Sequence, residues 1–177
     1  MLKNEVIETI LNRRSVRSYT EQEISRETLE TLVQAGLWAP TGKNAQSWRF
    51  TVLHTPERIT ELENALKAAA EATGGHAAGF RNPKAMILLS NDKDNDDGAQ
   101  DCSCAAENIM LAACSLGLGS VWLNPLMRAG DQPEVREELR SLGIPDNHKV
   151  WAAIALGYPA AAPAAPARKQ DVVAWID

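Results

Sequence analysis

The sequence predicts a single domain in which helices and strands alternate, an α+β or α/β fold with helices on both faces of a central sheet. Three observations lead to this prediction. Helical and extended patterns follow one another along the chain. Two apolar runs, residues 85–89 and 150–156, are continuous rather than alternating, which is typical of strands buried on both faces. The chain has 177 residues, enough for one hydrophobic core but too few for two full domains.

The first half of the chain is expected to form three helices and one strand. Ser25 is a suitable N-cap, Pro40 stops the helical pattern that follows it, and Thr55 precedes a proline that fits the first position of a helix. The expected elements are an amphipathic helix over residues 4–13, a helix from Ser25 to Pro40, a strand over 48–54 and a helix from Thr55 to Gly74.

The second half is expected to continue the alternation and to end in an arm. Residues 99–116 carry few polar side chains, as expected of a helix buried on most sides. The other expected elements are strands over 85–89, 121–123 and 150–156 and a helix over 131–142. Residues 157–177 begin with a stretch rich in proline and alanine, so we expect one domain over 1–177 with an extended C-terminal arm that docks on a distant surface.

Composition and charge disfavour several classes of protein. Hydrophobic residues make up 45% and charged residues 23%, close to the globular average. No apolar stretch approaches the roughly 20 residues of a membrane span, no signal peptide is expected at the N-terminus, and three cysteines leave no complete disulfide framework. A cytoplasmic protein is therefore expected.

The net charge of −5 is concentrated in one place. Residues 91–101 hold five aspartates and one lysine, while the rest of the chain is nearly neutral. Without a basic face, nucleic acid is not an expected partner. The acidic stretch lacks the spacing of a calcium loop, so we interpret it as a solvated loop.

The segment RRSVRSY at residues 13–19 is a candidate for binding an anion. It follows the end of the first expected helix and offers three guanidinium groups and two serine hydroxyl groups, a combination that suits a phosphate. The alternative is structural, because cations near a helix C-terminus also stabilise the helix dipole.

The segment APTGKNAQSW at residues 39–48 has the composition of a turn. Asn44 and Gln46 each present a donor and an acceptor, which suits the edge of a heterocycle. The pattern of a P-loop is absent. The alternative is an ordinary turn between a helix and a strand.

Two further segments carry weaker signals. The glycines of 117–119, followed by Asn124 and Pro125, suit a close approach of the backbone, but this pattern alone is weak evidence for a dinucleotide site. Arg168 and Lys169 form a second basic pair that is able to reach a phosphate, or else is solvated on the tail.

The cysteines are better explained as packing residues than as a metal or redox site. Cys102, Cys104 and Cys114 do not converge on one face of the expected helix, and His76 and His148 are distant in sequence. Buried cysteine behaves as a small hydrophobic residue.

Taken in order, these segments resemble the FMN-dependent nitroreductase family. The stretches that carry the resemblance are RRSVRSY at 13–19, APTGKNAQSW at 39–48, AENIMLAACSLGLGSVWLN at 106–124, ALGYP at 155–159 and ARKQDVV at 167–173. The resemblance implies a three-layer α/β/α fold with a mostly antiparallel sheet. It also implies a homodimer with FMN at the subunit interface, each C-terminal arm reaching onto the partner.

The resemblance assigns the cofactor contacts to two subunits. Arg13 and Ser15, with Arg168 and Lys169, would hold the FMN phosphate. Arg17 of the same subunit would lie near flavin N1 and O2, where it stabilises the charge left by reduction.

The remaining contacts would surround the ring and the ribityl chain. Arg14 would lie near the ribityl chain or the ring edge, and the partner's Asn44 and Gln46 would bond the pyrimidine edge. The residues expected alongside are Pro40, Thr41, Leu123 and Asn124, the last two where the family offers a backbone donor to N5.

Three departures from the family pattern are visible. Ser47 stands where the family often has proline. Asn124 and Pro125 replace a segment that contains glycine, and Pro125 has no N–H to offer N5. The chain also lacks the helical insertion that usually shapes the substrate pocket, so an open pocket is expected.

The function implied is two-electron hydride transfer by a ping-pong mechanism, from NADH or NADPH to nitroaromatic compounds or quinones. No side chain need act as an acid or base, because the flavin carries the hydride. The alternatives are another flavin reaction on the same fold, such as dehalogenation or enoate reduction, or a flavin-binding carrier or sensor with little turnover.

Overall fold

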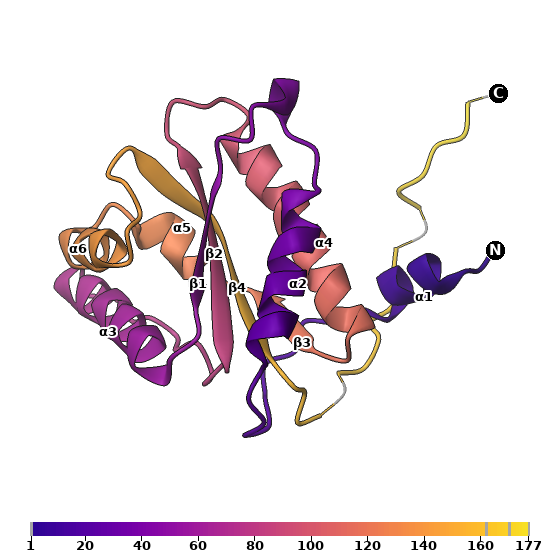
Figure 1. The fold of residues 1–177 in the computed structure, drawn as a ribbon, viewed down its shortest axis with the longest axis horizontal. Coiled ribbons are helices and arrows are strands. Elements are labelled where there is room, and N and C mark those ends of the chain that lie inside the picture. The colour runs from indigo at the N-terminus through magenta and orange to yellow at the C-terminus, as the bar shows by residue number, and fades with distance from the viewer. Residues whose placement is uncertain (1, 162, 170, 177) are drawn as a thin grey trace.

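The computed structural model describes residues 2–161, 163–169 and 171–176, and it has three layers. The central sheet contains β1 (Arg49–Leu53), β2 (Ala85–Asp92), β3 (Gly119–Trp122) and β4 (His148–Gly157) in the order β1-β2-β4-β3, and every pairing is antiparallel. Figure 1 shows helices on both faces of this sheet. The predicted α+β three-layer class is confirmed.

The two central strands are those that the apolar runs predicted. In β2, all residues from Ala85 to Asn91 are buried, because β1 and β4 flank the strand and helices cover both of its faces. Alternate residues of β2 pack into different cores: Ile87 lies in the cluster with α2 (Arg26–Leu37) and α4 (Gly98–Ser115), and Leu88 lies in the cluster on the opposite face. This explains why neither side of the strand carries a polar pattern.

The helices of the opposite face are α3 (Pro56–Ala72), α5 (Pro125–Ala129) and α6 (Pro133–Ser141). Each has proline in its first turn, where the missing N–H makes no helical hydrogen bond. The short helix α5 was not predicted from the sequence, although Asn124 and Pro125 are the same type of start signal as Thr55 and Pro56.

The acidic stretch is shorter than expected. Strand β2 continues to Asp92 and α4 begins at Gly98, so the loop between them covers only residues 93–97. Asn91 and Asp101, interpreted as ends of a solvated loop, are 0% and 4% exposed. The interpretation as a solvated loop is therefore wrong at both ends.

Helix α1 (Glu5–Asn12) lies beside the C-terminal end of α4, where Cys114 Sγ is 3.8 Å from the carbonyl oxygen of Thr9, and it buries none of its residues (Figure 1). Asn4 caps it by accepting a hydrogen bond from the N–H of Ile7 at 2.9 Å. Its apolar residues Val6 and Ile10 are 65% and 46% exposed. Among the described residues, no helix is long and apolar enough to cross a membrane.

The segment after α1 runs along the edge of the sheet. The N–H of Val16 donates to the carbonyl of Ser120 at 2.9 Å, and the N–H of Thr20 donates to the carbonyl of Tyr158 at 2.8 Å. Gly157 permits the close approach of this segment, because a Cβ there would lie 2.6 Å from the ring of Tyr19. Residues 15–20 are thereby fixed against β3 and the end of β4.

We expect Gly157→Ala to lower the free energy of unfolding by about 1–3 kcal/mol, because the added methyl group would overpack the Tyr19 ring. Urea unfolding measures this. Gly75→Ala is the control, since a Cβ there meets nothing closer than 3.4 Å and should change stability by less than about 0.5 kcal/mol. Equal stability of the wild type and Gly157→Ala would contradict this packing.

Candidate functional site

The arginines of segment 13–17 lie in three different environments. Arg13 Nε is 3.7 Å from the Glu107 carboxylate of α4. Arg14 Nη1 donates to the carbonyls of Leu11 and Arg13, each at 2.7 Å, so in this chain it does what the structural alternative expected of a cation at a helix end. Arg17 is exposed, with Nη1 3.4 Å from the carbonyl oxygen of Ser15.

A cavity of about 190 Å³ lies between this segment and the start of β3. Two guanidinium-bearing residues, Arg13 and Arg14, line it beside the loop that ends α4 and begins β3. The remaining lining residues are Asn12, Val16, Cys114, Gly117, Leu118, Gly119, Ser120 and Pro159. Positive groups beside backbone amides in a small cavity suit a phosphate.

Tyr19 connects the segment at residues 13–17 to strand β4. Its hydroxyl group donates to the carbonyl of Val16 at 2.9 Å and lies 3.4 Å from the carbonyl oxygen of Ala155 on β4. Burial raises the pKa of this hydroxyl group, and the Arg17 guanidinium offsets part of the rise. Tyr19 therefore remains a protonated donor at any physiological pH.

The turn at residues 41–47 has an unusual backbone. Lys43, Asn44 and Gln46 have φ angles of 54°, 55° and 48°, the left-handed region that non-glycine residues rarely occupy. The Gln46 amide donates to Asn44 Oδ1 at 3.0 Å, so the two candidate side chains lie side by side. Both are exposed and able to contact a ligand.

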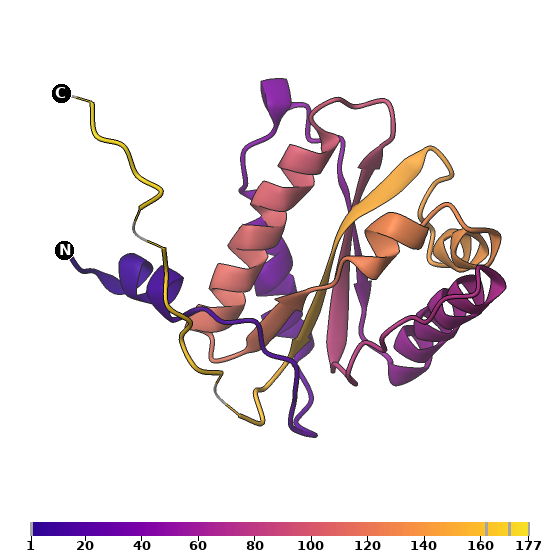
Figure 2. The same ribbon diagram turned by 180° about the vertical axis from the view of Figure 1, so that it is seen from behind.

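The structure does not bring the two candidate segments together within one chain. The N–H of Gly42 bonds Asp101 in the first turn of α4, while Cys114, near the other end of α4, lines the arginine cavity. From Asp101 to Cys114 the helix rises about 20 Å. Figures 1 and 2 agree that the turn containing the short helix η1 (Gly42–Asn44) and helix α1 lie at opposite ends of α4.

The other predicted residues lie between β3 and α5, in the 39–48 segment and on the arm. The N–H of Leu123 donates to the carbonyl of Ala153 at 2.8 Å, and the exposed Asn124 precedes α5. Arg168 and Lys169 are in the exposed C-terminal arm, which leaves the body of the molecule in Figure 1. Of the 39–48 segment, Pro40 is exposed and Thr41 is half-buried.

Sequence reasoning missed the residues that support the turn. Asp101 accepts a hydrogen bond from the N–H of Gly42 at 2.9 Å, and Asn95 Nδ2 donates to Ser47 Oγ at 3.1 Å. The available signal was the position of Asp101 inside an otherwise apolar helical pattern, which a solvated loop does not explain.

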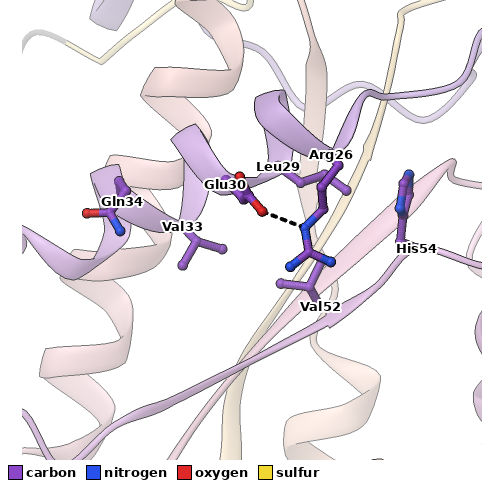
Figure 3. Close-up of a pocket in the computed structure, with 7 residues that line it drawn as sticks. All are labelled: Arg26, Leu29, Glu30, Val33, Gln34, Val52 and His54. Atoms are coloured by element: carbon purple, nitrogen blue, oxygen red, sulfur yellow. Dashed lines mark hydrogen bonds and ion pairs between the residues drawn. The ribbon is translucent and has the colours of Figure 1, made fainter.

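A second hollow, of about 310 Å³, lies between α2 and the edge strand β1 (Figure 3). Its floor is apolar, and an ion pair between Arg26 and Glu30, 2.8 Å long, lies at its rim with His54. His54 Nε2 is 2.9 Å from the carbonyl oxygen of Ile24. No residue predicted for the cofactor site lines this hollow.

The cysteines occupy separate environments. Cys102 is buried, Cys104 is exposed and Cys114 is intermediate. Burial raises the pKa of the Cys102 thiol to about 12, with a further rise from the Asp101 carboxylate, so this thiol stays neutral. The described residues contain no group of three or more His, Cys, Asp or Glu side chains that could hold a metal ion.

Sequence comparisons identify relatives over most of the chain. A model of the nitroreductase family matches residues 10–158. A protein of Archaeoglobus fulgidus, provisionally named an NADH dehydrogenase or NAD(P)H nitroreductase, is 35% identical over 159 residues, which cover 88% of this chain and 86% of the relative. The NADPH-flavin oxidoreductase of Vibrio harveyi is 33% identical over 166 residues, covering 88% of this chain and 66% of the relative.

Solved structures show the same fold. A nitroreductase of Bacteroides fragilis with bound FMN has a TM-score of 0.93 at 35% identity, covering 99% of this chain and 100% of its own. A nitroreductase of Desulfitobacterium hafniense, with a TM-score of 0.87 at 23% identity, covers 99% of this chain and 100% of its own and supports the fold alone. The chain therefore belongs to the nitroreductase family.

Proposed function

We propose that this chain is an FMN-dependent NAD(P)H oxidoreductase that acts as a homodimer and reduces nitroaromatic compounds or quinones. The observation that carries the proposal is the arginine-lined cavity beside β3, together with an amide-bearing turn that the same chain holds at the far end of α4. The bound FMN of the Bacteroides fragilis relative and the name of the Vibrio harveyi relative support the cofactor and the donor.

The cavity suits the phosphate end of FMN. Its volume of about 190 Å³ is below the range of about 300–1,000 Å³ typical of sites for larger ligands. A phosphate would be held by Arg13 in the cavity, by the neighbouring Ser15 and by Arg168 and Lys169 of the arm, and Arg14 at the cavity wall would face the ribityl chain. The flavin ring must therefore lie outside this cavity, over the neighbouring surface.

A second copy of the chain would complete the ring site. Because Asn44 and Gln46 lie about 20 Å along α4 from the cavity, the turn of one subunit is best placed to serve the cavity of the other. The exposed apolar side chains of α1 support an interface there, since the contact of this helix with the end of α4 leaves Val6 and Ile10 more than 40% exposed. Val172 and Trp175, 70% and 88% exposed on the arm, would be covered in the same assembly.

The protein contributes position and charge to the reaction. Bound FMN would supply the centre that accepts and donates hydride. Arg17 would stabilise negative charge at N1 and O2 of the reduced ring, and the amides of Asn44 and Gln46 would hold the pyrimidine edge. Because the N–H of Leu123 already bonds Ala153 and Pro125 has none, Asn124 is the proposed backbone donor to N5.

Anaerobic mixing with NADH and NADPH tests the proposal. We expect the purified protein to take up FMN, and either donor to bleach the flavin absorbance. Addition of a nitroaromatic compound or a quinone should restore the absorbance. Double-reciprocal plots of rate against donor concentration, at several fixed acceptor concentrations, should be parallel, as in a ping-pong mechanism. Absence of FMN uptake rejects every flavin function, and uptake without bleaching favours a carrier or sensor.

We expect Arg17→Ala to lower the flavin midpoint potential and to slow bleaching by at least about tenfold, because the reduced form loses its stabilising charge. The affinity for FMN should fall less than the bleaching rate. Potentiometry and stopped-flow absorbance measure the two effects. Arg140→Ala, which removes an exposed arginine of α6 that pairs with Asp146, is the control and should change neither. An unchanged potential in Arg17→Ala contradicts the role of Arg17.

We expect Val6→Asp with Ile10→Asp to convert the dimer to a monomer and to release FMN together, because two charges would be placed in the proposed interface. Light scattering measures the mass and absorbance measures the FMN content. Ala68→Asp on the exposed face of α3 is the control. A monomeric wild type that is fully loaded with FMN would overturn the shared site.

A further inference from the structure

Asp101 connects the turn at residues 41–47 to the body of the protein. It lies in the first turn of α4, is 4% exposed, and accepts the hydrogen bond of the Gly42 N–H at 2.9 Å through Oδ1. Its Oδ2 is also buried and has no hydrogen-bond partner among the described residues. A carboxylate in such a place is costly, so packing alone would favour an apolar residue.

The turn that Asp101 contacts is strained. Lys43, Asn44 and Gln46 have left-handed φ angles, which are unfavourable for lysine and glutamine and less so for asparagine, and such residues persist where surrounding structure fixes them. The strain falls on the residues whose amides are proposed to meet the flavin. If the turn relaxed to ordinary φ angles, the side-chain amides of Asn44 and Gln46 would both move.

Few of the contacts of the turn come from outside it. The bonds from Gln46 N to Thr41 Oγ1, at 3.2 Å, and from Gln46 Nε2 to Asn44 Oδ1 join the turn to itself. Among the described residues, the side chains of Asp101 and Asn95 make hydrogen bonds to the turn from outside it. Of these two, only Asp101 belongs to a long helix. The backbone of Gly42 is also pressed against the start of α4, where a Cβ would overlap the Asp97 carboxylate.

We propose that Asp101 is a positioning residue for the flavin ring. By holding the Gly42 N–H, its carboxylate fixes the left-handed turn that aims the amides of Asn44 and Gln46 at the pyrimidine edge. This inference rests on the proposed function, and it adds a residue that touches neither FMN nor substrate. The partner subunit's ring site then depends on a hydrogen bond made entirely inside this subunit.

The test compares three variants by titrating the apoprotein with FMN and following flavin fluorescence. Asp101→Leu removes the acceptor, and we expect the dissociation constant to rise about 10- to 100-fold, as for a lost hydrogen bond to a charged group. Asp101→Asn keeps an acceptor oxygen and should stay within about threefold of the wild type, although its stability falls because the new amide group has no acceptor. Asp96→Leu, which removes an exposed aspartate from the loop before α4, is the matched control and should bind FMN normally.

A double-mutant cycle with Asn44→Ala separates positioning from a general structural effect. If Asp101 acts through the turn, the double variant Asp101→Leu with Asn44→Ala loses no more FMN affinity than the weaker-binding single variant. Amide hydrogen exchange of residues 42–46 should also accelerate in Asp101→Leu without FMN. Additive losses, or unchanged exchange, overturn the inference.

The outcomes distinguish this inference from the proposed function. A wild type that does not bind FMN rejects both. A wild type that binds FMN, with Asp101→Leu binding equally well, rejects the positioning role alone. A loss in Asp101→Asn as large as in Asp101→Leu also rejects it, because the effect would then follow the charge. Thermal unfolding shows that each variant is folded, and Asp101→Ala replaces Asp101→Leu if leucine prevents folding.

Discussion

The packing of α4 against the central strands is the constraint on which the rest of the molecule depends. Its buried face includes the alanines Ala105, Ala106 and Ala113, all fully buried, which let the helix lie close to β2 and β4. Buried residues occur along the whole helix, from Gly98 to Ala113, so packing against the sheet fixes both of its ends. One end holds the turn at 41–47 and the other borders the arginine cavity. In the proposed homodimer, the helix would set the distance between the two half-sites.

The exposed side chains of the proposed site are positioned by hydrogen bonds that lie beneath them, so the site need not be buried. The catalytic surface of a flavin enzyme must stay open to two successive substrates, so the groups around the ring cannot be held by a surrounding core. In the proposed site, these groups would instead be held by bonds from their own segments to the body of the protein. Tyr19 anchors the arginine segment to β4, and Asp101 anchors the turn to α4. The half-buried Tyr19 and the buried Asp101 both bond backbone atoms, which fixes the position of each segment while leaving its exposed side chains free to bind.

The sequence predicts the elements well where one physical cause dominates. The runs 85–89 and 150–156 are continuous because helices cover both faces of those strands, and they became β2 and β4. Prediction failed where the role of a residue depends on a contact with a segment distant in sequence. Asp101 looked like one more acidic loop residue, since its acceptor role depends on Gly42, 59 positions earlier. Helix α5 was missed because Pro125 was considered for its missing N–H alone, although proline also begins helices.

The candidate site was predictable as a set of segments and not as an arrangement. Residues 13–17 and 41–47 stand out by their chemistry, but no spacing rule shows that one helix keeps them about 20 Å apart. That separation has a genetic consequence. If each ring site takes its arginines from one subunit and its turn from the other, an allele defective at Arg13 and an allele defective at Asn44 should complement each other. Their mixed dimer would contain one site with both lesions and one site with none, so two inactive alleles would restore activity when expressed together.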